Sequence, residues 1–377
     1  MAEVGGHCDA RFTPVREAFT ANLDRGLDTG ASVAVALDGE LVVDLWGGSR
    51  DPEGSEPWQA DTITNVWSTT KPMTALCALI LADRGELDLD APVADYWPEF
   101  AAAGKGAVEV RHLMAHTSGL AGWDEPLTPH DLYDWERCTS LLAAQAPWWP
   151  PGTASGYHAL TQGYLVGEVV RRITGETLGG FLAREVTGRL GADFHIGLAP
   201  EHDARVAPVI PPGGDLVGGL DPGGLPARTL ANPRLDARVA WEPAWRRAEI
   251  PAANGHGNAR SVATVQSVLA CGGAARGVRL LSEQGCETVF REQANGVDLV
   301  LGLPLRLGVG YGLNSPAMPI SPNPRACFWG GWGGSLVLCD LDARLCVAYV
   351  MNRMGEGTVG DMRGAGLVGA TYTSLPG

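Results

Sequence analysis

The pair Ser68 and Lys71 is the first feature of the sequence that could perform chemistry. The residues stand three apart in Ser68-Thr-Thr-Lys71, where an apolar run that predicts a helix begins. On a helix, side chains three residues apart share one face, about 5–6 Å apart at Cβ. The positive end of the helix dipole disfavours an ammonium group, and a neutral lysine amine can take the proton of a serine. The alternative is that Ser68 only caps the helix and that Lys71 is a surface lysine.

Lysine is scarce in this chain, which gives Lys71 further weight. Only Lys71 and Lys105 are lysines among the 28 basic residues. Arginine can fill most surface and ion-pairing roles of lysine, but its pKa above about 12 keeps it from losing its proton. Lys71, one turn after a serine, is therefore the position where arginine could not replace lysine. Lys105 lies between two glycines, and we expect it to be an ordinary exposed lysine.

A tyrosine and a glycine-rich turn could complete such a site. Tyr157 precedes a predicted helix, where its hydroxyl could carry a proton or its ring could simply pack. The neighbouring His158 could be a catalytic histidine or an ordinary surface histidine. The segment Trp329-Gly-Gly-Trp332-Gly-Gly-Ser335 joins two apolar strands. Its glycines could bring a backbone N–H close to a developing oxyanion, or they could mark a β-bulge.

Composition and charge exclude several classes of function. The chain has 377 residues, of which 45% are hydrophobic, so it can bury a large core. A formal net charge of −15 argues against nucleic acid and anionic membranes as partners. The longest apolar run, at residues 73–82, is too short for a bilayer, which needs about 20 residues. Since the first six residues show no secretion signal, we predict a cytoplasmic protein.

No metal ion or cofactor is expected. The eight cysteines include no Cys-x-x-Cys pair, and we expect them to be reduced and mostly buried. His112 and His116 have the spacing that places two imidazoles on one helix face, but no third ligand stands nearby. No glycine-rich stretch matches a nucleotide-binding fingerprint.

The predicted elements place strands at both ends of the chain and helices between them. Strands are predicted, from hydrophobic runs and turn signals, at residues 31–37, 41–46, 299–301, 306–309, 325–329, 335–340 and 345–351. Helices are predicted, from apolar spacing and breaker residues, at residues 12–26, 69–82, 132–145, 159–173, 178–190 and 359–371. We therefore predict an α/β (α+β) fold in which both termini complete one sheet.

This pattern also predicts how the chain is divided. Residues 1–105 and 259–377 would form the sheet lobe with its flanking helices, and residues 106–258 would form an inserted, mostly helical lobe. Within the latter, residues 200–258 are rich in glycine and proline, which is typical of a functional lid or a disordered linker. Trp241 and Trp245 favour a packed lid. The cleft between the two lobes is the expected binding site.

Taken in order, these segments resemble the serine β-lactamase and penicillin-recognising superfamily, in particular the class C β-lactamase-like family VIII carboxylesterases. The resemblance covers almost the whole chain. It rests on the segments Thr64-Asn-Val-Trp-Ser-Thr-Thr-Lys71, Val110-Arg-His-Leu-Met-Ala-His-Thr-Ser-Gly-Leu120, Tyr157 with Gly163-Tyr-Leu-Val-Gly-Glu-Val-Val-Arg-Arg-Ile-Thr-Gly175, and Tyr311-Gly-Leu313. It implies a β-lactamase-like fold with an antiparallel sheet built from both termini.

The resemblance also implies a role for each candidate residue. Ser68 would be acylated by the substrate, while Lys71 and Tyr157 act as general base and acid. Trp329-Gly330-Gly331 would occupy the position of the superfamily's Lys-Thr-Gly motif. The oxyanion hole would then consist of the backbone N–H groups of Ser68 and Trp332. Residues expected to contact the substrate are Trp329, Gly330, Gly331, His158, Trp241 and Trp245.

Two departures from the superfamily pattern indicate the substrate class. Ala159 stands where β-lactamases and D-Ala-D-Ala peptidases usually carry an asparagine that binds the substrate amide, and Trp329 replaces a lysine that helps to bind the β-lactam carboxylate. A site without these polar groups loses its recognition of amide and carboxylate. We therefore predict a serine carboxylesterase that cleaves uncharged, short-chain or hydrophobic esters, with weak or absent β-lactamase activity. The sequence also lacks a Gly-x-Ser-x-Gly elbow, which argues against an α/β-hydrolase.

Two alternatives use the same residues differently. The site could transfer the acyl group to an alcohol or amine, or open a lactone or β-lactam. In a different class, the chain would be a catalytically silent binder of acyl ligands, which the joint presence of Ser68, Lys71 and Tyr157 disfavours. The natural substrate and the oligomeric state do not follow from the sequence.

Overall fold

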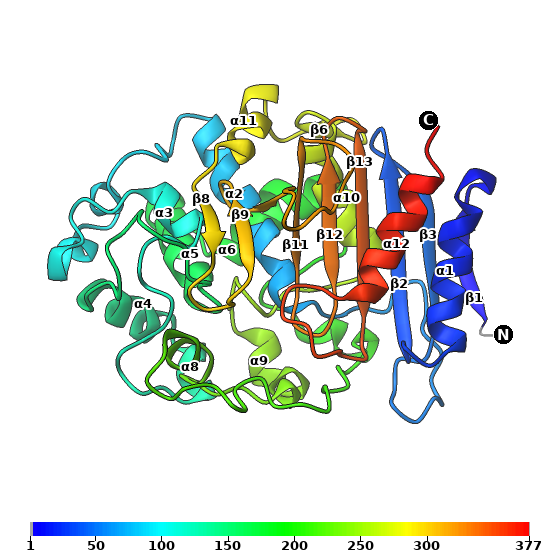
Figure 1. The fold of residues 1–377 in the computed structure, drawn as a ribbon, viewed down its shortest axis with the longest axis horizontal. Helices are drawn as coiled ribbons and strands as arrows, with labels where there is room; N and C mark the ends of the chain where they lie inside the picture. Colours follow the sequence, from blue (N-terminus) through cyan, green and yellow to red (C-terminus); the bar gives the residue numbers. More distant parts are fainter. Residues whose placement is uncertain (1–2, 377) are drawn as a thin grey trace.

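A nine-stranded antiparallel sheet forms the centre of the computed structural model, which describes residues 3–376 (Figure 1). Residues 1, 2 and 377 of the predicted sheet lobe lie outside this description. The strand order is β1-β3-β2-β13-β12-β11-β10-β9-β8. Strands come from both ends of the chain, as predicted: β1 (Val4–Cys8), β2 (Gly30–Leu37), β3 (Glu40–Gly48), β8 (Ala294–Val297), β9 (Pro304–Leu307), β10 (Gly312–Leu313), β11 (Ala326–Gly330), β12 (Leu336–Asp340) and β13 (Leu345–Met351).

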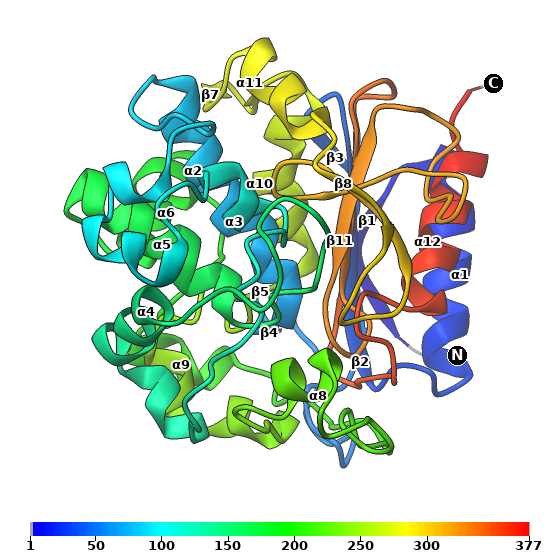
Figure 2. The ribbon, with the colours of Figure 1, turned by 60° about the vertical axis from the view of Figure 1, so that its left-hand side comes forward.

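Helices cover both faces of this sheet. On one face, α10 (Ala259–Ala270) packs against β2, β12 and β13. On the other, α1 (Thr13–Asp24) and α12 (Met362–Thr373) pack side by side (Figure 2). Strands that are buried on both faces carry almost continuous apolar runs rather than alternating ones. The sequences of β2 and β13 have this character, and β13 is buried along its whole length.

The helices from the middle of the chain lie beyond α10, away from the sheet (Figure 2). Among them are α2 (Lys71–Asp83), α3 (Val110–Met114), α4 (Trp135–Ala144), α5 (Thr161–Thr174) and α6 (Leu178–Leu182). The helix α2 is at the centre of this group, where it packs against α5 and α6. A helix that is apolar on all sides must be buried, and α2 is buried from Lys71 to Leu81. Pro72 lies in its first turn, where the missing N–H costs no hydrogen bond.

Some elements differ from the predictions. The helix α10 was missed, although Asn258 and Ser261 form a reciprocal cap at its start. The strand predicted at 299–301 is wrong, because the Asp298 carboxylate accepts hydrogen bonds from the N–H groups of Val300 and Leu301 and fixes a turn there. The short strands β1 and β10 were also missed, and β8 lies earlier than the predicted strand. The helix predicted at 178–190 is divided by a π-helical segment at Ala183–Thr187 before α7 (Gly188–Leu190).

Residues 200–258 carry only short elements, among them α8 (Leu225–Leu230) and α9 (Pro243–Arg247). The end of this segment pairs with the residues before α2, through the short strands β4 (Thr64–Asn65) and β5 (His256–Gly257). Trp245 is fully buried and donates its indole N–H to the Asn65 side chain. The segment is therefore packed against the residues that precede Ser68.

Lys105 is buried, not exposed as expected. Its Nζ donates to the carbonyl oxygens of Ala102 and Ala143, at 2.8 and 2.9 Å, and to that of Gln145. The last two carbonyls lie at the C-terminal end of α4, where helix carbonyls lack partners within the helix. The neighbouring glycines indicated a loop, but not that the end of a helix lies against it.

All eight cysteines are free, and all but Cys8 are buried. No helix within residues 3–376 combines the length and the hydropathy that crossing a bilayer requires.

Candidate active site

Ser68 lies in a 3-10 turn, Trp67–Thr70, that continues directly into α2. Trp67, the residue before it, has a φ of 49°. This left-handed conformation is unfavourable for a residue with a bulky side chain and persists only where the surroundings impose it. Here the Trp67 ring is held between Trp245 and Trp332, with ring centroids 5.7 and 4.9 Å away. The packing around Trp67 thus fixes the direction in which the Ser68 side chain points.

Lys71 places its amine beside the Ser68 hydroxyl. The side chain is 1% exposed, and its Nζ lies 3.1 Å from Ser68 Oγ and 2.9 Å from Tyr157 Oη. It also donates to the carbonyl oxygens of Ala159 and Ala252, at 2.8 and 3.0 Å. Among the described ion pairs none involves Lys71, and burial lowers the pKa of this lysine well below its usual value.

These contacts match the hydrogen-bonding capacity of a neutral amine. Such a group has two N–H donors and one lone pair. The carbonyl groups of Ala159 and Ala252 accept the two N–H bonds, which leaves one lone pair that can accept the hydrogen of either the Ser68 or the Tyr157 hydroxyl. The amine is therefore oriented to accept a proton from the serine, either directly or through the tyrosine.

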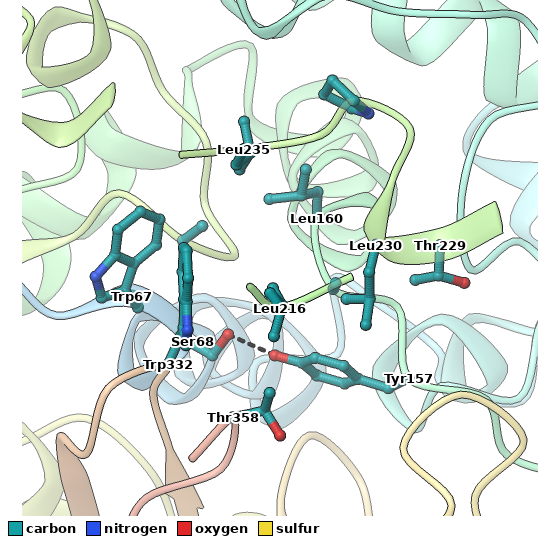
Figure 3. A pocket seen from close by; sticks show the side chains of 13 residues that line it. Trp67, Ser68, Tyr157, Leu160, Leu216, Thr229, Leu230, Leu235, Trp332 and Thr358 are labelled. Atoms are coloured by element: carbon teal, nitrogen blue, oxygen red, sulfur yellow. Dashed lines mark hydrogen bonds between the residues drawn. The ribbon is translucent and has the colours of Figure 1, made fainter. Parts of the chain in front are cut away.

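Tyr157 is the third member of this group. Its hydroxyl and the Ser68 hydroxyl form a short hydrogen bond, drawn in Figure 3. Burial raises the pKa of Tyr157 above its usual value, so the side chain is a neutral phenol near pH 7. Its backbone N–H donates to Asp298 Oδ1 at 3.0 Å, which fixes the start of the loop that presents the ring.

The glycine-rich turn after β11 lies against the nucleophile segment. Gly331 donates its N–H to Ser335 O at 2.8 Å, and Ser335 Oγ donates to Val66 O at 2.8 Å. A Cβ at Gly331 would lie 2.3 Å from Ser335 Oγ and 2.5 Å from Val66 O, so only glycine fits there. The next residue, Trp332, lines the same cavity as Ser68.

Two backbone amides beside the cavity, one in each of these turns, are available to a ligand. Within residues 3–376, no described backbone hydrogen bond uses the N–H of Ser68 or of Trp332. Both residues line the cavity, which makes their amides suitable donors for an oxyanion formed at Ser68.

A cavity opens over Ser68 (Figure 3). Ser68, Tyr157, Thr229 and Thr358 contribute its polar side chains. The rest of the wall is apolar and consists of Trp67, Ala159, Leu160, Leu216, Leu230, Pro233, Leu235, Ala253 and Trp332. Most of the aliphatic residues come from 216–235, an irregular stretch without periodicity, and sequence reasoning did not identify them.

Several residues expected at the substrate lie behind this wall, which corrects those expectations. His158 is fully buried, and its ring bonds Ser118 Oγ at 2.7 Å and Gly156 O at 2.6 Å, so it cannot reach the cavity. Trp245 lies behind Trp67. Trp241 is 41% exposed and donates to Val209 O, away from the cavity.

Trp329 and the two glycines after it also lie outside the cavity wall. Trp329 is 2% exposed and stacks on His116, with ring centroids 5.3 Å apart. A Cβ at Gly330 would lie 2.4 Å from the backbone nitrogen of Gly360, because the loop before α12 approaches the end of β11 closely. Gly331 contacts the nucleophile segment instead of the cavity. These residues support the site from behind.

The two histidines that were considered as metal ligands do not share a helix face. The helix α3 ends at Met114, and His116 has a φ of 60°. Its Nδ1 accepts the backbone N–H of His158 at 3.1 Å. In the part of the chain that the structure describes, no group of three His, Cys, Asp or Glu side chains could hold a metal ion.

A buried lysine and a buried tyrosine that share the hydroxyl of a serine at the start of a helix define a Ser-x-x-Lys serine site. Comparison with known proteins gives its family: the Beta-lactamase family model matches residues 17–369. The chain therefore belongs to the beta-lactamase family, and its large antiparallel sheet with flanking helices is the β-lactamase-like fold of that family.

Three relatives illustrate the similarity. The chain is 36% identical to the esterase/beta-lactamase LipL of Mycobacterium tuberculosis over 365 residues, which cover 93% of this chain and 83% of LipL. It is 44% identical to a family VIII carboxylesterase of known structure, with a TM-score of 0.93 and coverage of 99% and 100% of the two chains. A penicillin-binding protein homologue from Caulobacter crescentus is 39% identical, with a TM-score of 0.92 and the same coverage.

Proposed function

We propose that the protein is a serine carboxylesterase that cleaves short-chain or hydrophobic esters through an acyl-enzyme on Ser68. The observation that carries this proposal is the position of Lys71 Nζ and Tyr157 Oη, both at hydrogen-bond distance from Ser68 Oγ in an apolar cavity. The names of LipL and of the family VIII carboxylesterase support a hydrolase that acts on esters.

Acylation follows from the protonation states of the group. Neutral Lys71 takes the Ser68 proton, directly or with Tyr157 as the intermediate carrier, while Oγ attacks the ester carbonyl carbon. The negative charge that develops on the carbonyl oxygen is stabilised by the N–H groups of Ser68 and Trp332. When the tetrahedral intermediate collapses, the proton passes through Tyr157 to the leaving alkoxide, and the alcohol departs.

Deacylation uses the same groups in reverse. A water molecule takes the place of the alcohol, and Lys71 and Tyr157 accept its proton as it attacks the acyl carbon. The C–O bond to Ser68 then breaks, the proton returns to Ser68 Oγ and the carboxylic acid is released.

The cavity wall favours an ester over a β-lactam. Ala159 offers no side-chain amide, and the buried Trp329 leaves no cation to bind a carboxylate. Because LipL is named as a β-lactamase as well as an esterase, nitrocefin belongs in the assay. We expect its hydrolysis to be slower than that of simple esters.

The test is turnover of p-nitrophenyl acetate, p-nitrophenyl butyrate and nitrocefin by the wild type and by Ser68→Ala. Ester hydrolysis that is lost in Ser68→Ala but kept in Ser315→Ala, a control away from the cavity, supports the proposal. Mass spectrometry after treatment with an alkyl phosphonate ester should find the label on the peptide that contains Ser68. Unlabelled Ser68 together with no ester turnover would indicate a non-catalytic binder instead.

A further inference from the structure

A polar groove adjoins the apolar cavity. It lies between residues 211–216 and 234–238, and it shares Leu216, Leu235 and Trp332 with the cavity. Ser68 and Tyr157 line the cavity but not the groove. These three shared residues therefore form the border across which a substrate bound at Ser68 could extend into the groove.

Two ion pairs give the groove its polarity. Arg234 pairs with Asp215 at 2.6 Å and connects the two walls, and Arg238 pairs with Asp236 at 2.9 Å on one wall. The four side chains are between 49% and 65% exposed, so solvent and ligands can reach them. Their charges cancel in pairs, which leaves donors and acceptors but no surplus charge. A neutral hydroxyl group can bond to such a pair, whereas an ionic group would have to compete with it.

The proposed mechanism determines which half of an ester would point toward the groove. Tyr157 delivers a proton to the leaving oxygen, so the alcohol lies on the Tyr157 side of Ser68. Trp332 lies on the other side of the Ser68 hydroxyl (Figure 3). With the carbonyl oxygen at the N–H groups of Ser68 and Trp332 and the alcohol beside Tyr157, the acyl chain is the half of the ester left to extend past the Trp332 side chain toward the groove.

We propose that the groove is a subsite for an acyl group with a neutral hydroxyl at its far end. The preferred substrate class would be an ester of a hydroxylated carboxylic acid with an apolar alcohol. The stem of the acyl chain would pack on Leu216 and Leu235, and its hydroxyl would bond to Asp215 and Arg234. This inference rests on the proposed esterase function and adds to it the chemistry of the acyl group.

The test compares esters that differ only at the end of the acyl chain. We would measure kcat/KM for p-nitrophenyl hexanoate and p-nitrophenyl 6-hydroxyhexanoate, and for the corresponding pair with eight carbons. The leaving group is the same in all four. We expect the terminal hydroxyl to raise kcat/KM at least fivefold in one of the two pairs.

A double variant locates this preference in the groove. Asp215→Leu with Arg234→Leu removes both charges of the bridging pair, so that neither remains unpaired. The hydroxyl preference should then fall to about one, because the end of the groove becomes apolar. The matched control, Glu176→Leu with Arg184→Leu, removes another exposed ion pair, at 2.7 Å, that lines neither the groove nor the cavity.

The possible outcomes distinguish a failure of the proposed subsite from a failure of the proposed esterase function. Hydrolysis of all four esters without any hydroxyl preference would overturn the subsite and leave the esterase in place. A preference that survives the Asp215 and Arg234 double variant would also overturn it. If none of the four esters is hydrolysed, the proposed function fails and the subsite fails with it.

Discussion

Lys71 and Lys105 are the two lysines of the chain, and both have their amines buried among backbone carbonyls. Lys105 Nζ donates to three carbonyl oxygens, which satisfies all three N–H bonds of an ammonium group. Lys71 Nζ has two carbonyl partners and two hydroxyl partners. Burial lowers the pKa of both, to about 8 for Lys105 and well below the usual value for Lys71.

The difference shows that burial alone does not make a lysine a general base. Three carbonyl acceptors favour the charged form of Lys105 and give the lysine a role in joining the end of α4 to a loop. Hydroxyl groups, in contrast, can give a proton as well as accept one. The partners of Lys71 therefore allow proton transfer, and the partners of Lys105 allow only binding.

The largest expected effect comes from exchanging each lysine for methionine. Lys71→Met should lower kcat for p-nitrophenyl butyrate by about 10³-fold, within the range observed for general acid–base groups. Lys105→Met should change kcat less than threefold but lower the free energy of unfolding by about 1–3 kcal/mol, because buried carbonyls lose their donor. Steady-state kinetics and urea unfolding measure the two effects. A large loss of kcat in a well-folded Lys105→Met variant would contradict the assignment of a structural role to Lys105 and a catalytic role to Lys71.

A pair of tyrosines sharpens the same comparison. Tyr157→Phe removes a hydroxyl that bonds Ser68 and Lys71, and should lower kcat/KM by about 10²-fold or more. Tyr164 is the matched control, since it is also fully buried but donates its hydroxyl to the Leu132 carbonyl at 2.5 Å. Tyr164→Phe should leave kcat/KM within a factor of about three. Similar losses in both variants would mean that any buried tyrosine hydroxyl matters, and the assignment of Tyr157 as a proton carrier would then fail.

The smallest expected effect is on the pH dependence of stability. Lys105 has a pKa of about 8 in the folded protein and a higher one when unfolded, near 10.5, so the unfolded chain binds more protons between these pH values. The contribution of Lys105 to the free energy of unfolding should therefore rise with pH across that window, by less than about 1.4 kcal/mol per pH unit. Lys105→Met should show a flatter curve of unfolding free energy against pH from 8 to 10. An identical curve in the two proteins would mean that the pKa of Lys105 is not lowered.

The pairing of Ser68 with Lys71 could be predicted from sequence because the two residues are one helical turn apart. Tyr157 lies 89 residues from Ser68, and only the family resemblance connected it with the pair. The sheet was predictable for a similar reason, since apolar runs separated by turns mark most of its strands. In both cases local pattern and tertiary structure agree.

The cavity wall and the environment of Lys105 could not be predicted in this way. Leu216, Leu230 and Leu235 come from a stretch whose position depends on contacts such as the bond from Gly214 N to Glu356 Oε1. Lys105 bonds carbonyls about 40 residues further along the chain. Trp245 and Trp329 were predicted to contact the substrate, but their side chains lie behind the cavity wall. The residue types suggested that these tryptophans lie near the site, but they did not indicate which way the side chains point.

The seam between β2 and β13 has a consequence for how the protein reaches its native state. Ala31 pairs with Met351 across this seam, so the middle of the sheet joins segments from opposite ends of the chain. Contacts at such separation form late, because closing the intervening loop costs entropy before the contact contributes. The ribosome must therefore synthesise the chain past residue 351 before β2, which already pairs with β3 in a local hairpin, can pair with β13. Until then the edge of β2 that will face β13 has no partner strand, and unpaired apolar edges of this kind favour aggregation.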